Sequence, residues 1–189
     1  MYKLCKTNQS IDRQQQIASR LVELLEEQPY AEITVSGLCR ECYISRNVFY
    51  KYFDSIDAVL DFIGDKLALD FEKYISQNTA EMTYVEEGAR FFRYWYQQRD
   101  VLDIIIENNL LEVIFARIVL KLTENQVGAN QLPDEMPEKY YSWVVHFALY
   151  GLAAMLTKWH NENYKTSPEE LAEASVYLLT NPIFGMRKE

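Results

Sequence analysis

The chain contains little glycine, proline, cysteine or histidine. Its 189 residues include six Gly, five Pro, three Cys and two His. So few glycines leave little material for a phosphate-binding loop, and neither a Walker loop nor a G-x-G-x-x-G pattern occurs. An odd number of cysteines argues against a small secreted fold held by disulfide bonds. A serine–histidine–aspartate pattern is also absent. We therefore expect a protein that is not an enzyme and that binds neither a metal nor a cofactor.

The sequence also lacks a long apolar run. The residues before Ser10 contain no apolar stretch of the kind found in a signal peptide. The stretch from Tyr141 to Thr157 is uncharged, but its 17 residues lie at the lower limit for a membrane-spanning helix and include Ser142 and His146. We interpret this stretch as a buried helix. We therefore expect a cytoplasmic protein without membrane contact.

Hydrophobic residues make up 49% of the chain and recur mainly with the period of a helix. No segment has the alternating pattern and turn dipeptide of a β-hairpin. The predicted fold is therefore all-α, with about nine helices. Ser or Thr precedes several of them as an N-cap. The predicted N-caps are Thr34, Ser45, Thr83 and Ser167. The predicted helices span about 11–27, 35–42, 46–53, 56–78, 84–98, 101–107, 110–126, 138–162 and 168–180.

Two short predicted helices, separated only by Tyr43-Ile44-Ser45, follow a longer one, which is the pattern of a helix-turn-helix. On the second short helix the apolar residues can face the other two helices while the polar residues face outward. Arg and Asn can pair with base edges, and Tyr, Lys, Ser and Thr can contact phosphates. An ordinary solvated three-helix bundle has the same spacing. The predicted DNA contacts are Thr34, Ser36, Ser45, Arg46, Asn47, Tyr50 and Lys51, and the predicted inward anchors are Val48, Phe49, Tyr52 and Phe53.

Residues 33–53 resemble the DNA-binding domain of the tetracycline-repressor (TetR/AcrR) family of bacterial transcription regulators. The resemblance depends on the combination of Ser45, Phe49-Tyr50 and Tyr52-Phe53. It implies a helix-turn-helix domain at 1–53, followed at 54–189 by a helical domain for ligand binding and dimerisation. The segment from Trp143 to Ala172 is similar to a C-terminal domain of family members from low-GC Gram-positive bacteria.

Three positions depart from the family pattern. Cys42-Tyr43 replaces Ala-Gly in the turn, Asn47-Val48 replaces Gly-Thr, and Ile56 stands where a lysine is common. These changes remove phosphate-binding groups and place a tyrosine where glycine has free access to positive φ. These changes leave open a second interpretation, in which the protein is a transcriptional co-regulator that acts through a protein partner and has weak or no DNA binding of its own. A small-molecule carrier with a vestigial helix-turn-helix also stays open.

Cys39 and Cys42 form a C-x-x-C pattern without further ligands nearby. A redox role needs a thiol of low pKa, and a metal site needs more ligands. Because both cysteines stand where the family has small core residues, core packing is favoured over a thiol sensor.

The resemblance implies a small-molecule effector in the second domain, and aromatic residues are the candidates for its binding site. The alternative is that these aromatics simply fill the core. The predicted ligand-binding residues are Phe91, Tyr94, Trp95, Phe115, Trp143, Phe147 and Tyr150.

Ala148, Gly151 and Ala154 recur at a spacing of three, which allows a second helix to approach closely. The resemblance implies a homodimer through the last two long helices, at 138–162 and 168–180, with Leu171 and Leu178 in the same interface. Such a dimer would place two reading helices on a roughly palindromic double-stranded DNA operator. A ligand would shift the helix at 56–78 and so change operator affinity, with repression as the expected outcome.

The formal net charge is −9, but it is unevenly distributed. Residues 1–55 contain 7 Lys+Arg and 7 Asp+Glu, whereas residues 56–189 contain 12 and 21. Residues 34–51 have a net charge of +2. The acidity therefore belongs to the second domain, and we expect modest, strongly salt-sensitive DNA binding.

Overall fold

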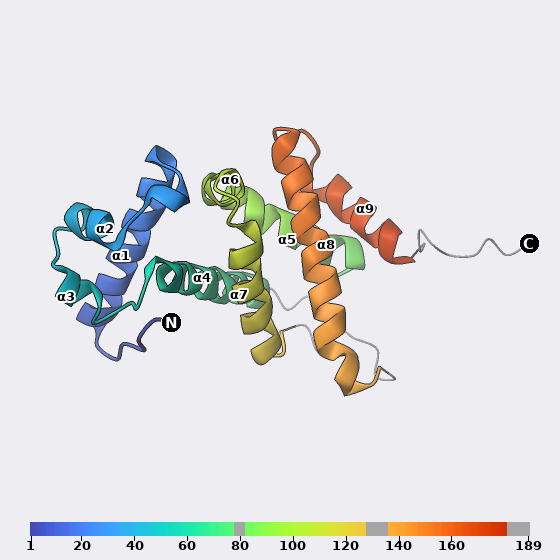
Figure 1. Ribbon diagram of the computed structural model, residues 1–189. Coiled ribbons are helices and arrows are strands. Elements are labelled where there is room, and N and C mark those ends of the chain that lie inside the picture. Colours follow the sequence, from blue (N-terminus) through green and yellow to red (C-terminus); the bar gives the residue numbers. More distant parts are fainter. Residues whose placement is uncertain (78–81, 128–135, 181–189) are drawn as a thin grey trace, which may run out of the picture.

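The computed structural model describes residues 1–77, 82–127 and 136–180 (Figure 1). These residues form nine α-helices and two short 3-10 turns, Tyr30–Glu32 and Glu138–Tyr140, with no β-strand among them. The all-α prediction is confirmed. The helices are α1 (Asn8–Glu27), α2 (Val35–Glu41), α3 (Arg46–Phe49), α4 (Ile56–Ser76), α5 (Tyr84–Gln97), α6 (Arg99–Glu107), α7 (Leu111–Glu124), α8 (Tyr141–Asn161) and α9 (Pro168–Thr180).

The four predicted N-caps are confirmed by hydrogen bonds. The Thr34 hydroxyl accepts from the Gly37 amide at 3.0 Å, and the Ser45 hydroxyl accepts from the Val48 amide at 3.3 Å. The other two belong to reciprocal capping boxes, in which a glutamate three residues on accepts from the cap amide. Those boxes are Thr83 with Glu86 and Ser167 with Glu170.

Some helix ends differ from the expectation. Helix α1 begins at Asn8 instead of about residue 11, because Thr7 caps it by accepting from the Ser10 amide. Helix α3 ends at Phe49, residues 50–52 continue as turns rather than regular helix, and Phe53 lies in an isolated bridge. The amides of those residues still bond to carbonyls three or four residues back, so the side chains keep a helix-like order.

Helices α1–α3 form one end of the molecule, α8 and α9 lie toward the other, and α4 runs between them (Figure 1). The core of the first unit is fully buried, with no exposed surface on Ile17, Leu21, Leu38, Phe49 or Phe53. The apolar residues of α1 recur at helical spacing and form one side of this core. The aromatic residues of the α3 segment, which we define as residues 46–53, form the other side.

The second unit is built on close helix contacts at small residues. A Cβ on Gly64 of α4 would lie 2.7 Å from the Cβ of Arg117 on α7. A Cβ on Gly88 of α5 would lie 3.3 Å from the Cβ of Ala172 on α9. Glycine therefore allows both pairs of helices to approach closely. Within the described ranges, no helix is sufficiently long and apolar to cross a membrane.

Candidate nucleic-acid interface

The α3 segment separates polar and apolar side chains as the sequence predicts. Phe49 and Phe53 have no exposed surface, and Val48 and Tyr52 are half-buried. Their burial fixes the orientation of the segment on α1 and α2. The four outward-facing side chains are exposed, and they are Arg46, Asn47, Tyr50 and Lys51.

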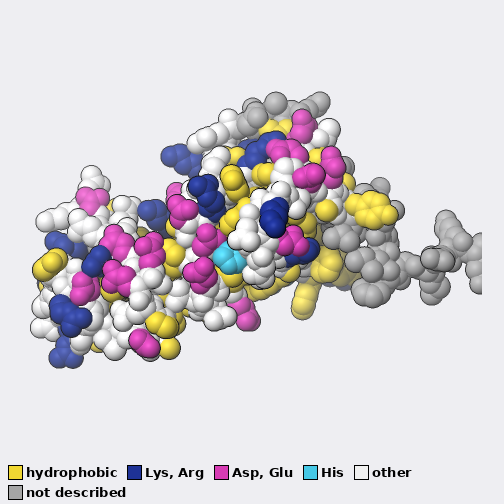
Figure 2. Space-filling view, turned by 90° about the horizontal axis from the view of Figure 1, so that it is seen from above, with side chains coloured by type: hydrophobic (Ala, Val, Ile, Leu, Met, Phe, Trp, Pro, Cys, Tyr) yellow, Lys and Arg dark blue, Asp and Glu magenta, His cyan; other side chains and the backbone are white. Residues whose placement is uncertain are grey.

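Thr34 and Ser36 are also exposed, at the start of α2. The Thr34 and Ser45 hydroxyl oxygens accept cap hydrogen bonds, so each hydroxyl keeps a hydrogen to donate to another group. Figure 2 shows Lys and Arg side chains projecting at the end of the molecule that α2 and α3 form. The seven predicted DNA contacts are thus all exposed, and they lie within residues 34–51, which have a net charge of +2.

The turn between α2 and α3 has an unusual backbone. Tyr43 has a φ of 54°, in the left-handed region that favours glycine. The Ile44 amide donates to the Cys39 carbonyl at 3.0 Å, and the Tyr43 amide donates to the Arg40 carbonyl at 3.1 Å. This pattern is a Schellman motif, in which the residue with positive φ is usually glycine. The Tyr43 side chain is 97% exposed.

The N-terminal segment supports the end of the α3 segment through contacts that no local sequence pattern predicts. Tyr2 pairs with Phe53 in an isolated antiparallel bridge, and the Lys3 amide donates to the Tyr52 carbonyl at 2.9 Å. The Gln14 side chain of α1 donates to the Lys3 carbonyl at 2.8 Å. These contacts hold the first residues of the chain against the last turn of the reading segment.

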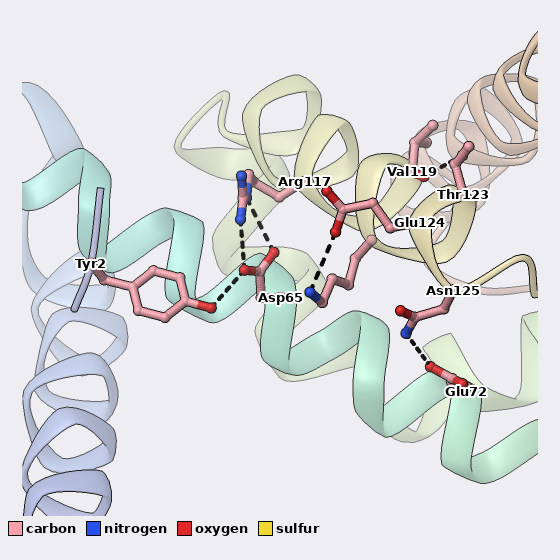
Figure 3. Close-up of polar contacts among 9 residues, drawn as sticks. Tyr2, Asp65, Glu72, Arg117, Val119, Thr123, Glu124 and Asn125 are labelled. Carbon is pink, nitrogen blue, oxygen red and sulfur yellow. Dashed lines mark hydrogen bonds and ion pairs between the residues drawn. The ribbon is translucent and has the colours of Figure 1, made fainter. Parts of the chain in front are cut away.

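The same N-terminal segment reaches the second domain through a buried carboxylate on α4 (Figure 3). Asp65 is 4% exposed and accepts a 2.7 Å hydrogen bond from the Tyr2 hydroxyl. Arg117 of α7 binds the same carboxylate with two groups, Nε at 3.1 Å and Nη2 at 2.6 Å. Burial and the hydrogen bond to Asp65 raise the pKa of Tyr2 to about 12, so its hydroxyl remains a donor at neutral pH.

A second bridge joins α6 to α1. The Asn108 side chain donates to the Leu25 carbonyl at 3.0 Å and accepts from the Tyr30 amide at 3.1 Å. One turn earlier on α6, Asp103 accepts from the Tyr164 hydroxyl and pairs with His160 of α8. Helix α6 thus touches both α1 and α8. Neither bridge has a local sequence pattern, because the partners lie 57 or more residues apart.

The predicted ligand-binding aromatics fall into two groups. Four are in the core, where Trp95 stacks on Phe115 with 5.2 Å between ring centroids, and none is more than 6% exposed. Those four are Phe91, Tyr94, Trp95 and Phe115. Trp143, Phe147 and Tyr150 instead lie on the outside of α8, with 76%, 78% and 39% of their surface exposed. The structure therefore does not bring these three together with the buried four, because α8 buries its opposite face.

The exposed α8 aromatics extend the stripe that was predicted for dimerisation. Residues at positions 143, 147, 150, 151 and 154 share one helix face at spacings of three, four and seven. Gly151 and Ala154 are exposed and Ala148 is half-buried, and a Cβ on Gly151 would meet nothing within 4 Å. On α9, Leu171 is half-buried, whereas the side chain of Leu178 lies outside the described residues.

The two cysteines of the C-x-x-C pattern lie in the first unit. Cys39 is 3% exposed and Cys42 is half-buried. Burial raises the pKa of both thiols, and that of Cys42 reaches about 11. No group of three or more His, Cys, Asp and Glu side chains that could hold a metal occurs within the described residues.

A helix-turn-helix with an exposed polar reading face, joined to a second helical unit, defines a DNA-binding transcription regulator. Residues 17–62 match the family model described as bacterial regulatory proteins of the tetR family. Residues 68–181 match the model described as a transcriptional regulator C-terminal region. The chain belongs to the tetR family of bacterial regulatory proteins.

Several solved structures have a similar fold. The fatty acid degradation regulator FadR from Bacillus halodurans is 16% identical with a TM-score of 0.58, covering 96% of this chain and 99% of that one. FadR from Thermus thermophilus, a repressor in complex with lauroyl-CoA, is 16% identical with a TM-score of 0.55, covering 91% and 95%. The dihydroxyacetone kinase operon activator DhaS is 21% identical with a TM-score of 0.51, covering 90% and 95%. No curated protein matches the chain significantly.

Proposed function

We propose that the protein is a homodimeric repressor whose operator affinity is controlled by a small molecule bound in the second domain. The observation that carries the proposal is the α3 segment, whose exposed Arg46, Asn47, Tyr50 and Lys51 lie above a fully buried aromatic pair. Residues 1–53 form the DNA-binding domain in this proposal, and residues 54–189 form the ligand-binding and dimerisation domain. A cytoplasmic location fits such a role.

The dimer forms through α8 and α9. The α8 stripe at 143–154 exposes large aromatics around small residues, and such a surface is stabilised when a second copy covers it. Two-fold symmetry then presents two α3 segments to successive major grooves of a roughly palindromic operator.

Ligand control acts through α4 and α6 in this proposal. A ligand that separates or reorients the buried aromatics of α5 and α7 would move Arg117, and with it the Asp65 carboxylate and Tyr2. Such a ligand shifts operator affinity only if it binds the two arrangements with different affinity. Because the FadR structure from Thermus thermophilus is a complex with lauroyl-CoA, a molecule with a long apolar part is the first effector class to test.

A co-regulator that acts through a protein partner is the second candidate. The observation in its favour is that Ile56, at the start of α4, is 9% exposed and packs into the core. No lysine can therefore offer a phosphate contact from that position.

Arg46→Ala tests the main proposal. A duplex is first selected from random-sequence DNA by the full-length protein at low salt, and its affinity is then measured by gel shift. Removing a guanidinium that reads a base or holds a phosphate costs about 1–3 kcal/mol per contact, so affinity falls about 5- to 150-fold.

Arg99→Ala is the matched control, because it removes the same charge from an exposed residue on α6. Its affinity should stay within about twofold of the wild type. Equal binding by the Arg46 variant would contradict the reading role. Failure of the wild-type protein to select any duplex would favour the co-regulator.

A further inference from the structure

Tyr43 is exposed to an extent that core packing does not explain. Its side chain is 97% exposed, and among the described residues no other large apolar or aromatic side chain has a higher exposed fraction. Nothing in the fold of the monomer requires an aromatic ring at this position.

The backbone at Tyr43 makes this exposure more costly. A φ of 54° brings Cβ close to the neighbouring carbonyl, so glycine would adopt the same turn with less strain. The same backbone conformation occurs at Gln126, so the strain alone assigns no role. The exposed ring is what points to a role outside the monomer.

The surroundings of Tyr43 are suited to a polyanion. Three residues of extended chain span at most about 11 Å, so Tyr43 lies beside Arg46 and the start of the α3 segment. Arg40, three residues before it, has a side chain that is 79% exposed. The acidic residue closest to it in sequence, Glu41, is paired with Arg20 at 2.9 Å and with Arg40 at 3.3 Å.

We propose that Tyr43 is an additional DNA contact, which packs its ring on the sugar and donates its hydroxyl to a phosphate oxygen beside the groove that α3 enters. The inference rests on the proposed DNA binding and adds a positioning residue to it. Phosphate and sugar contacts fix register without reading sequence. The contact should therefore strengthen binding to any duplex.

Tyr43→Gly tests the proposal because stability and binding should change in opposite directions. Glycine removes the backbone strain, so the melting temperature of the full-length protein rises. The affinity for the selected duplex falls about tenfold, and that for an unrelated duplex of equal length falls similarly. Tyr43→Phe, which keeps the ring, loses less. Since no charge is removed, the slope of log affinity against log salt stays the same.

Gln126→Gly is the matched control. Gln126 has a φ of 51° and occupies the same place in a Schellman motif at the end of α7, with the Val127 amide donating to the Leu122 carbonyl at 3.0 Å. This variant should gain stability and bind DNA as the wild type does.

Each other outcome is decisive. Unchanged affinity of Tyr43→Gly, with wild-type binding intact, overturns the Tyr43 inference and leaves the proposed function standing. A loss confined to the selected duplex shows base reading and overturns the backbone contact. A lower melting temperature gives Tyr43 a structural role. If the wild type itself binds no duplex, the proposed function fails and this inference fails with it.

Discussion

The polar residues of the first domain are of two kinds, those that stabilise the fold and those that do not. The hydroxyl oxygens of Thr34 and Ser45 accept the cap hydrogen bonds of two helices, so a substitution there weakens the helix as well as any DNA contact. Arg46, Asn47 and Lys51 are exposed and have no such structural duty in the described residues. Side chains of the second kind are the ones whose substitution reports on DNA binding alone.

The thiols of the first domain give a prediction at the same scale. The thiolate is the reactive form, and the pKa of about 11 at Cys42 leaves roughly a hundredfold less thiolate at pH 8 than an ordinary cysteine has. In a Cys5→Ser/Cys39→Ser variant, Cys42 should therefore react with an aromatic disulfide reagent far more slowly in the native than in the unfolded protein. The rate should rise about tenfold per pH unit up to about pH 11, measured by absorbance. Rapid native reaction at pH 8 would restore the thiol-sensor alternative.

At the level of helices, a feature such as a cap can be predicted from the sequence when only four or five consecutive residues determine it. The caps at Thr34, Ser45, Thr83 and Ser167 are correct because each needs only a hydroxyl and a nearby amide. Helix α6 begins two residues before its predicted start, because Gln98 both ends α5 and begins α6 without a side-chain cap.

Contacts between helices were not predictable in this way. Asp65 meets Arg117 across 52 positions and Tyr2 across 63, so no local pattern marks them. The division of the aromatics has the same origin. Helical spacing shows that Trp95 and Phe147 each lie on an apolar face, but only the packing of the other helices decides which face is covered.

The contact of α4 with α7 gives the prediction at this scale. Gly64→Ala would place Cβ 2.7 Å from the Arg117 Cβ and 3.2 Å from the Ile114 carbonyl oxygen. The two helices must then separate, and overpacking of this kind costs about 1–3 kcal/mol, more than the gain of about 1 kcal/mol in helix propensity. Urea unfolding should show a net loss of stability. Lys66→Ala, an exposed position on the same helix, is the control and should be nearly neutral; a stabilised Gly64 variant would contradict the close approach.

At the scale of the whole molecule, the two ends have different surfaces. The excess of acidic residues belongs to residues 56–189, whereas residues 34–51 at the α2–α3 end have a net charge of +2. Helix α8 lies away from α2 and α3 (Figure 1). A dimer through α8 would therefore leave both reading surfaces uncovered and keep the acidic bodies away from the duplex.

Phe147→Glu tests this arrangement. Phe147 is 78% exposed in the single chain, so the substitution leaves the monomer fold intact, but in the proposed dimer it removes two buried rings and introduces two unpaired charges. The dimer dissociation constant should rise at least about a hundredfold, measured by sedimentation, and affinity for a palindromic duplex should fall with it because two half-sites no longer bind together. Leu69→Glu is the control, since it places the same charge on an exposed apolar position of α4. If the Phe147 variant remains dimeric and the Leu69 variant dissociates, the dimer interface lies on α4 and not on α8.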